Sequence, residues 1–501
     1  MHLVLRSPER RTAARAVALV VVVVAGVYVA YANLGRQTEY VDEFTYAGAG
    51  WQYVHGALTG NLQHPPTAKY LYGLAQLVLG EGVGAARVVA ATASFGTGVV
   101  LFAWLRRPIG FWGALLAAGW WWCTPRAAAA TWADVASGAG VRIDRLALLE
   151  PLMVFFAVAA VAVAWHAVTR ESDDDHGRWR AAGWWALSGA LFALSVTSKV
   201  STAVVFLAIA ALPALHRRWR AYAIGAPVAA VSFLVVFAAV YLPVGGVRAI
   251  RFMLAFQTAH DVNGHTTTLL GRQYQFAPWW ANAARVVEGV GWPTVVVLVL
   301  GLLAAVLVRP DPLVGVLGTA LAALVVFYCT AQVALPYYYD AWMPWTIALA
   351  ATGLVRAARL RPPWTTVVAL VAVAATVLPA VVVVRTVAES RETGFARLSA
   401  ALDHRGVPSD DRILVAGSPR AAFSHWTGRR ASTDAAARGD FGVVVAGADE
   451  RFPLRPALSR LLADEPGRFT TFRVDFLRVW VVRGDAAVRV RDGRTALVDE
   501  R

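Results

Sequence analysis

Long apolar runs recur through the first three quarters of this sequence, and several approach or exceed the roughly 20 residues that a helix needs to cross a bilayer. Apolar residues make up 58% of the 501 residues, whereas charged residues make up only 16%. Both observations argue against a soluble globular protein. The sequence therefore predicts a polytopic α-helical membrane protein.

The apolar runs predict eleven transmembrane helices. A further apolar run at 66–80 is shorter and contains Lys69, so we expect it to form an interfacial helix rather than a span. The expected spans cover residues 16–34, 84–105, 110–124, 147–168, 183–197, 200–215, 221–243, 293–308, 313–332, 338–355 and 364–384.

The positive charges indicate how these helices are oriented. A net charge of +15 would suggest a nucleic-acid partner in a soluble protein, but here the arginines cluster between apolar runs, as in cytoplasmic loops. We therefore expect no nucleic acid and a location in the plasma membrane. Arginines before the first run place the N-terminus in the cytoplasm. Ala30-Tyr31-Ala32 is similar to a signal-peptide cleavage site, but the length of the run favours an uncleaved helix.

The composition changes at about residue 386, which divides the sequence into two expected domains. Residues 1–385 are expected to form a transmembrane domain, with a first outer loop at 35–83. Residues 386–501 contain strand-like runs with a helical pattern at 455–464, and they predict a small extracytoplasmic α/β domain. The strand-like runs are 413–415, 441–445 and 472–482.

The first outer loop holds the most suggestive polar residues. Asp42 and Glu43 are adjacent carboxylates that could act as a general base, orient a hydroxyl or bind a divalent cation. The same loop carries His64 and Lys69, residue types found around sugars and phosphates. The alternatives are a solvated acidic pair and a lysine that extends to the interface from a helix end.

A second polar group lies at the outer end of the fourth expected span, where Arg142, Asp144 and Arg145 precede Glu150. Ionisable residues at membrane depth are costly and tend to line a cavity. A functional site is one interpretation of this group, and an ion pair that only joins two helices is the other.

Two further cationic positions are candidates for binding a phosphate. Lys199 interrupts a long apolar stretch and is one of only two lysines in the chain; it either marks a turn or contacts phosphate. Arg272 lies in the long outer loop 244–291 among aromatic residues, which suits either sugar binding or an interface belt.

The sequence lacks several motifs that bind nucleotides or zinc. It has no G-x-x-x-x-G-K-[ST] phosphate loop, no G-x-G-x-x-G after a strand and no H-E-x-x-H. ATP-driven transport within this chain is therefore not expected.

Taken in order, the polar motifs resemble those of a known family. An acidic pair followed by HPPTAK, then RLALLEPLMVFF at 145–156, TSK at 197–199 and GRQYQFAPWW at 271–280 is similar to the protein O-mannosyltransferases and their bacterial relatives, which include the aminoarabinose transferases. These are GT-C type integral-membrane glycosyltransferases that use polyprenyl-phosphate-sugar donors. The likeness covers most of residues 20–350.

The resemblance implies an activity and roles for residues. Asp42 would accept the proton of the acceptor hydroxyl, with Glu43 in support, and Glu150 would match the second acidic position of the family. Arg145 matches the arginine before that position, and the segment with His64 and Lys69 matches the donor side. Glu150 departs from the Asp that relatives often have. The lysine often found after the aromatic motif is absent from RVVEGVGWP at 285–293.

These roles imply partners for the chain. The donor would be a polyprenyl-phosphate sugar in contact with membrane lipids, and the acceptor would be a hydroxyl of a cell-envelope glycan, a lipid or a protein. Arg142, Lys199 and Arg272 join the expected phosphate-binding residues. Asp42, Glu43 and Glu150 could bind a divalent cation, Mg²⁺ or Mn²⁺. Alternatively, the cationic residues alone could neutralise the phosphate.

Two other functions remain open at this stage. A transporter or flippase of a lipid-linked intermediate would use the same polar groups as a path, although the paired broken helices of transporters are not evident in the sequence. A non-catalytic assembly protein would instead use the domain 386–501 to bind a partner.

Overall fold

The computed structural model describes most of the chain in fourteen ranges. They are residues 8–36, 40–126, 142–170, 175–265, 267–270, 272–308, 310–360, 362–390, 395–416, 428–433, 437–446, 454–474, 477–491 and 494–499. Two compact units are present. The first consists of Met1–Leu34 with Thr45–Glu389, and the second of Gly35–Phe44 with Ser390–Arg501.

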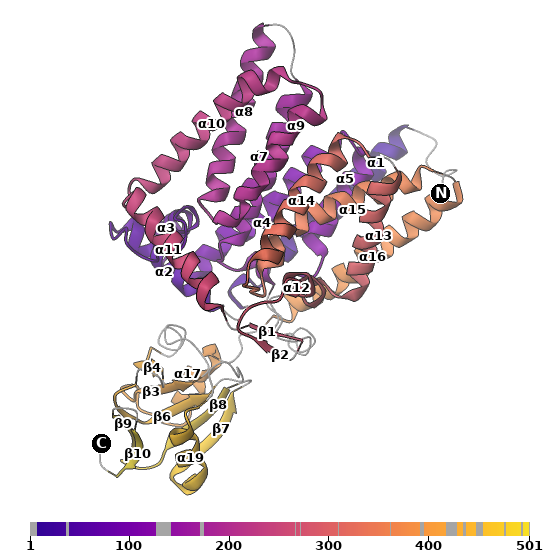
Figure 1. The fold of residues 1–501 in the computed structure, drawn as a ribbon. Coiled ribbons are helices and arrows are strands. Elements are labelled where there is room, and N and C mark those ends of the chain that lie inside the picture. The colour runs from indigo at the N-terminus through magenta and orange to yellow at the C-terminus, as the bar shows by residue number, and fades with distance from the viewer. Residues whose placement is uncertain are drawn as a thin grey trace. The chain divides into compact units, whose positions relative to one another are not determined.

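The first unit is a bundle of helices (Figure 1). The expected interfacial run at 66–80 forms the 13-residue helix α3, which is not among the candidate membrane spans. The helices are α1 (Pro8–Tyr31), α2 (Val41–Val54, which begins in the second unit), α3 (Thr67–Leu79), α4 (Val83–Leu105), α5 (Gly110–Cys123), α7 (Glu150–Thr169), α8 (Asp175–Val196), α9 (Phe206–Leu215), α10 (Arg220–Tyr241), α11 (Val247–Asn263), α12 (Ala281–Val290), α13 (Trp292–Val308), α14 (Pro312–Thr330), α15 (Met343–Ala358) and α16 (Pro362–Ala388).

Short elements connect some of these helices. They include three 3₁₀ turns, and two strands that pair antiparallel as a hairpin in the expected long outer loop. The turns are η2 (Ile143–Arg145), η3 (Val200–Val205) and η4 (Tyr338–Ala341), and the strands are β1 (Thr267–Leu269) and β2 (Arg272–Tyr274).

The polytopic helical class is confirmed, but the count of eleven spans is not. In the described residues, six helices are long and apolar enough to cross a membrane, or seven if α12 and α13, bent by 116°, form one span. Most of the other expected spans fall on shorter elements, whereas the span expected at 183–197 falls on the 22-residue helix α8. Helix α5, for example, has 14 residues, which gives a length of about 21 Å against the ~30 Å of a bilayer core.

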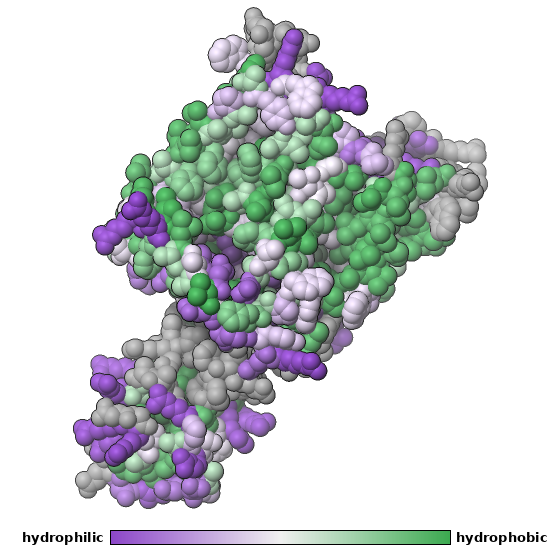
Figure 2. Space-filling view, viewed as in Figure 1, coloured by the Kyte–Doolittle hydropathy of each residue, from purple (hydrophilic) through white to green (hydrophobic). Residues whose placement is uncertain are grey.

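Much of the surface of the helical unit is apolar on the side that Figure 2 shows. Leu234 on α10 and Leu378 on α16 expose 62% and 68% of their surface, and their neighbours on the same helices are similarly exposed. Soluble monomers rarely expose such large apolar areas. The surface therefore fits contact with lipid chains.

Glycines allow two of these helices to pack closely. A Cβ atom at Gly353 of α15 would overlap the carbonyl oxygen of Gly301 on α13. At Gly301, a Cβ atom would lie 2.7 Å from the Cα of Ala350. Small residues let backbones approach each other inside membranes, so the α13–α15 contact depends on these two positions.

The second unit contains a five-stranded mixed sheet in the order β4 (Ala431–Thr433), β3 (Ile413–Ala416), β6 (Val443–Ala446), β8 (Leu477–Val482) and β7 (Phe469–Val474). β3 runs parallel to β4 and β6, while β8 runs antiparallel to β6 and β7. A three-stranded antiparallel sheet has the order β10 (Arg494–Val498), β9 (Ala487–Arg491) and β5 (Gly439–Phe441). This region is the expected strand-containing part of the chain.

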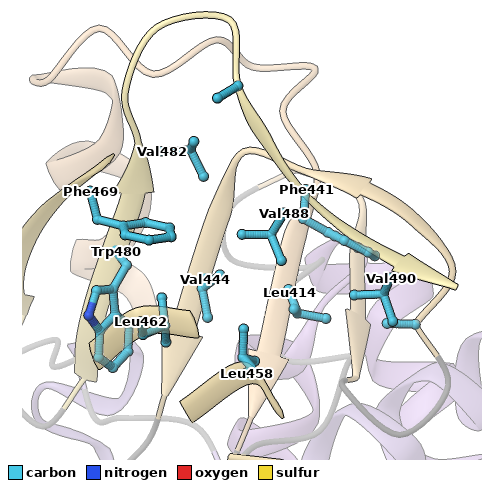
Figure 3. Close-up of a cluster of buried hydrophobic side chains, with 12 residues drawn as sticks. Leu414, Phe441, Val444, Leu458, Leu462, Phe469, Trp480, Val482, Val488 and Val490 are labelled. Carbon is cyan, nitrogen blue, oxygen red and sulfur yellow. The ribbon is translucent and has the colours of Figure 1, made fainter. Parts of the chain in front are cut away.

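Alternation along the strands gives the five-stranded sheet an apolar core on each face. Ile413 and Val415 cluster with Leu398 and Leu402 of α17 (Phe395–Asp403). Leu414 belongs instead to a cluster with residues of α19 (Pro456–Asp464) and of the three-stranded sheet (Figure 3). The domain boundary at 385/386 stays a prediction.

Replacing Gly353 with alanine tests the α13–α15 packing. We expect Gly353→Ala to lower the free energy of unfolding by about 1–3 kcal/mol, because overpacking forces backbone shifts. Thermal unfolding in detergent measures this change. Gly318→Ala on α14 is the matched control, since nothing lies within 4 Å of its Cβ position, and helix propensity there favours alanine by up to about 1 kcal/mol. Equal effects at both positions would contradict the packing account.

Candidate active site

Lys69 is a fully buried lysine at the start of α3. Its ammonium donates hydrogen bonds to the carbonyl oxygens of His64, at 2.8 Å, and Asn61, and it lies 5.4 Å from the centre of the Tyr53 ring. Asn61 has a left-handed φ of 49°. In the described part of the chain no carboxylate pairs with Lys69, and burial lowers its pKa to about 7.

His64 contacts Lys69 through its backbone carbonyl, which accepts a hydrogen bond from the lysine ammonium. Its ring packs edge-on against Tyr46, with centroids 5.5 Å apart, and against Phe256 at 6.0 Å. The imidazole therefore packs among aromatic rings, while the loop carbonyl contacts the lysine.

Lys199 differs from Lys69 because it has a carboxylate partner. Its ammonium forms an ion pair with Glu150, the first residue of α7. The ring centroids of Tyr338 and Tyr337 lie 4.1 and 5.3 Å from the same ammonium. The pair joins the LLEP and TSK motifs, and the two aromatic rings add cation–π attraction.

The segments around these lysines are tied together by hydrogen bonds. The amide of Thr67 donates to the carbonyl of Thr197 at 3.0 Å, and the hydroxyls of the same two residues lie 2.7 Å apart. The hydroxyl of Tyr72 on α3 donates to the carbonyl of Leu148. The structure thus connects the HPPTAK, LLEP and TSK segments, which are distant in sequence.

Asp144 is the centre of a buried ion-pair network. Arg142 donates to both of its oxygens, at 2.6 and 3.0 Å, and Ser94 donates at 2.7 Å. Arg126 pairs with Asp144 and also, at 3.0 Å, with Asp340. Burial alone would raise the pKa of Asp144, but the two arginines and the hydrogen bonds lower it well below its usual range. Arg142 is thus bonded to Asp144.

Sequence reasoning missed Arg126 and overlooked the role of Asp340. These residues are 214 positions apart, and each is a single charge beside an apolar run. Only Asp340 was noticeable, as the acid that ends a run of three tyrosines.

Arg145 is 1% exposed and holds the end of the first helix. Its Nη2 donates to the carbonyl of Ala32. Its Nε and Nη1 have no hydrogen-bond partner among the described residues. Two buried donors without partners are costly, so they suit an oxyanion brought by a ligand.

Asp42 and Glu43 lie in the first turn of α2. The Glu43 carboxylate accepts a hydrogen bond from the amide of Tyr40 at 2.7 Å, which is one half of a capping box. Asp42 is half-buried. Both residues belong to the segment Gly35–Phe44, which is grouped with the second unit, so their convergence with the buried cations stays a prediction.

Two other expectations concern Arg272 and a metal ion. Arg272 is exposed at the start of β2, and its role in donor binding stays a prediction. Within the described residues, no group of three or more His, Cys, Asp or Glu side chains could bind a metal ion.

Comparisons with known proteins relate this architecture to membrane glycosyltransferases. The family model "Dolichyl-phosphate-mannose-protein mannosyltransferase" matches residues 20–260. A comparison with curated protein sequences found no match.

Solved structures match over most of the chain. The crystal structure of ArnT from Cupriavidus metallidurans bound to undecaprenyl phosphate has a TM-score of 0.58 and 14% identity, covering 95% of this chain and 98% of that one. The archaeal oligosaccharyltransferase AglB from Archaeoglobus fulgidus, in complex with an inhibitory peptide and a dolichol-phosphate, has a TM-score of 0.55 and 11% identity. That match covers 87% of this chain and 70% of AglB. The chain is therefore a multi-pass membrane protein with the fold of the GT-C type glycosyltransferases, and it resembles the protein mannosyltransferase family over residues 20–260.

Proposed function

We propose that this protein transfers a sugar from a polyprenyl-phosphate donor to an acceptor hydroxyl, with Asp42 as the general base. The observation that carries the proposal is the buried ammonium of Lys69, which carbonyl oxygens and an aromatic ring surround. An uncompensated buried charge is costly. Such a site favours an anion as its missing partner, and a lipid phosphate is the anion that a membrane supplies.

Two other buried cations of the helical unit bear on where the phosphate would bind. Arg145 keeps two buried donors without partners in the described residues, and planar guanidinium groups bind phosphate oxygens well. Lys199 is already neutralised by Glu150. We therefore assign Lys69 and Arg145 as the principal phosphate-binding residues, and Lys199 as the partner of Glu150.

The proposed reaction is a single displacement. The acceptor oxygen attacks the anomeric carbon as the bond from that carbon to the phosphate oxygen breaks, so the anomeric configuration inverts. The phosphate leaves with the electron pair, and nearby cations stabilise its developing charge. Asp42 takes the proton of the hydroxyl, and Glu43 fixes the helix turn that carries Asp42.

We propose that cationic side chains, rather than a divalent metal ion, neutralise the leaving phosphate. Asp42, Glu43 and Glu150 are the acids that would bind Mg²⁺ or Mn²⁺, but Glu150 pairs with Lys199 and Glu43 with a backbone amide. Transfer that persists in a chelator would support this assignment.

The orientation and the acceptor complete the proposal. The N-terminus would lie in the cytoplasm, and the domain 386–501 would lie on the outer side of the plasma membrane. The solved ArnT structure holds undecaprenyl phosphate, so we propose a polyprenyl carrier of this kind for the present chain. The acceptor would be a glycan, lipid or protein of the cell envelope.

Replacing Asp42 tests the general base. We expect Asp42→Asn to lower sugar transfer by about 100-fold or more, because a positioned base contributes roughly 10²–10⁴-fold to rate, while binding of undecaprenyl phosphate stays unchanged. Transfer from a polyprenyl-phosphate sugar by purified protein in liposomes measures the rate. Wild-type turnover in the variant would remove Asp42 as base.

Lipid translocation without transfer in the wild-type protein would favour a flippase.

The pKa of Lys69 gives a pH dependence. Because burial lowers that pKa to about 7, the ammonium loses its proton as pH rises through 7. We expect the affinity for undecaprenyl phosphate to fall between pH 6 and pH 8. Lys69→Arg is the control, since arginine stays protonated and the titration of the lipid phosphate is common to both proteins. A parallel fall in both would contradict a role for Lys69.

A further inference from the structure

The turn η4 contains two residues, Tyr338 and Asp340, that have no role in the proposed reaction. Its first residue is Tyr338, whose ring lies 4.1 Å from the Lys199 ammonium. Its third residue is Asp340, which is 1% exposed and pairs with Arg126 at 3.0 Å. One short turn thus links the Glu150–Lys199 pair to the Asp144 network.

Arg126 contacts two segments at once, the one with Asp144 and the one with Asp340. Its side chain is fully buried, with its Cζ 3.6 Å from the centre of the Trp121 ring. One terminal nitrogen donates to Asp340, and the other donates to Asp144 and to the carbonyl of Trp121. A planar guanidinium can bridge in this way, whereas a lysine ammonium is a single point of charge.

The two carboxylates do not depend on Arg126 equally. Asp144 also accepts hydrogen bonds from Arg142 and Ser94. For Asp340, Arg126 is the hydrogen-bond donor to Oδ1, and Oδ2 has no partner in the described residues. Loss of this ion pair would therefore release Asp340 and its turn, while Asp144 would remain bonded.

Another contact on the same turn confirms that its position is tightly set. The hydroxyl of Tyr339 lies where a Cβ atom at Gly289 of α12 would be. Asp340 contacts Arg126 and Tyr339 contacts α12, so η4 is attached to the bundle at two adjacent residues. The rings of Tyr337 and Tyr338, at 5.3 and 4.1 Å from Lys199, are placed by the same turn.

We propose that Asp340 is a positioning residue, whose ion pair with Arg126 fixes η4 so that the two tyrosine rings hold the Lys199 ammonium against Glu150. The effect of this residue on sugar transfer rests on the proposed function, but its effect on Lys199 does not. We expect the loss of this contact to lower sugar transfer by about 10–100-fold, the range found when residues that orient metal ligands are replaced.

Lysine NMR measures the position of Lys199 without any enzymatic assay. Lys69 and Lys199 are the only lysines in the sequence, so ¹³C-labelled lysine gives two sets of side-chain signals in detergent-solubilised full-length protein. Methylene groups over the face of an aromatic ring are shifted upfield by the ring current. We expect Asp340→Asn to move the Lys199 signals away from their upfield position and to leave the Lys69 signals in place.

Asp311→Asn is the matched control. Asp311 also forms an ion pair with an arginine, Arg356. However, Asp311 lies just before the start of α14. The part of α14 near Lys199 is its other end, where the ring of Tyr328 packs against that of Tyr338. We expect this variant to move neither set of signals. Arg126→Lys serves as the second test variant if Asp340→Asn does not fold, and we expect it to move the Lys199 signals in the same direction.

The outcomes separate this proposal from the proposed function. Unchanged Lys199 signals in a folded Asp340→Asn protein, or in folded Arg126→Lys, would overturn the positioning role whatever the activity. Displaced signals in a protein that transfers no sugar, even as wild type, would support the positioning role and count against the proposed enzyme. Displaced signals together with about a 10-fold or greater loss of transfer would support both.

Discussion

Charges buried within an apolar helix bundle need partners, and this requirement organises the helical unit. Glu150 pairs with Lys199, while Asp144 and Asp340 share Arg126. Desolvating an ion costs several kcal/mol unless a partner and hydrogen bonds compensate. The ion pairs therefore lie where segments distant in sequence meet.

Lys69 departs from this pattern, and we propose that an anionic ligand is its partner. Its ammonium has neutral carbonyl oxygens around it and no carboxylate in the described part of the chain. The loop that supplies these carbonyls is in turn tied to the TSK segment through Thr67. A rigid cation without a counter-ion is suited to an anion that arrives and departs, as a lipid phosphate does in a transfer reaction.

Much of the architecture could be predicted from the sequence, because it depends on local patterns. The apolar runs predicted where the helices lie, and the short run with Lys69 predicted α3. Strand-like runs at 413–415 and 472–482 predicted β3 and β8, and a helical pattern at 455–464 predicted α19. The span count was harder, since helices such as α5 are apolar but short.

The pairing of charges could not be predicted in the same way. Lys199 and Glu150 are 49 residues apart, and the sequence marks both as unusual without showing that they meet. Arg126 bonds across 214 residues to Asp340, and neither residue belongs to a motif. The capping bond of Glu43 was equally hidden, because an acidic pair after a helix suggests chemistry as readily as a helix N-terminus.

An experimentally determined structure with undecaprenyl phosphate bound tests the central claim most directly. We expect a phosphate oxygen within about 4 Å of the Lys69 ammonium, the range of an ion pair, and the Nε and Nη1 donors of Arg145 directed at the same phosphate. Lipid phosphate bound elsewhere, with Lys69 still held by the loop carbonyls alone, would contradict the account.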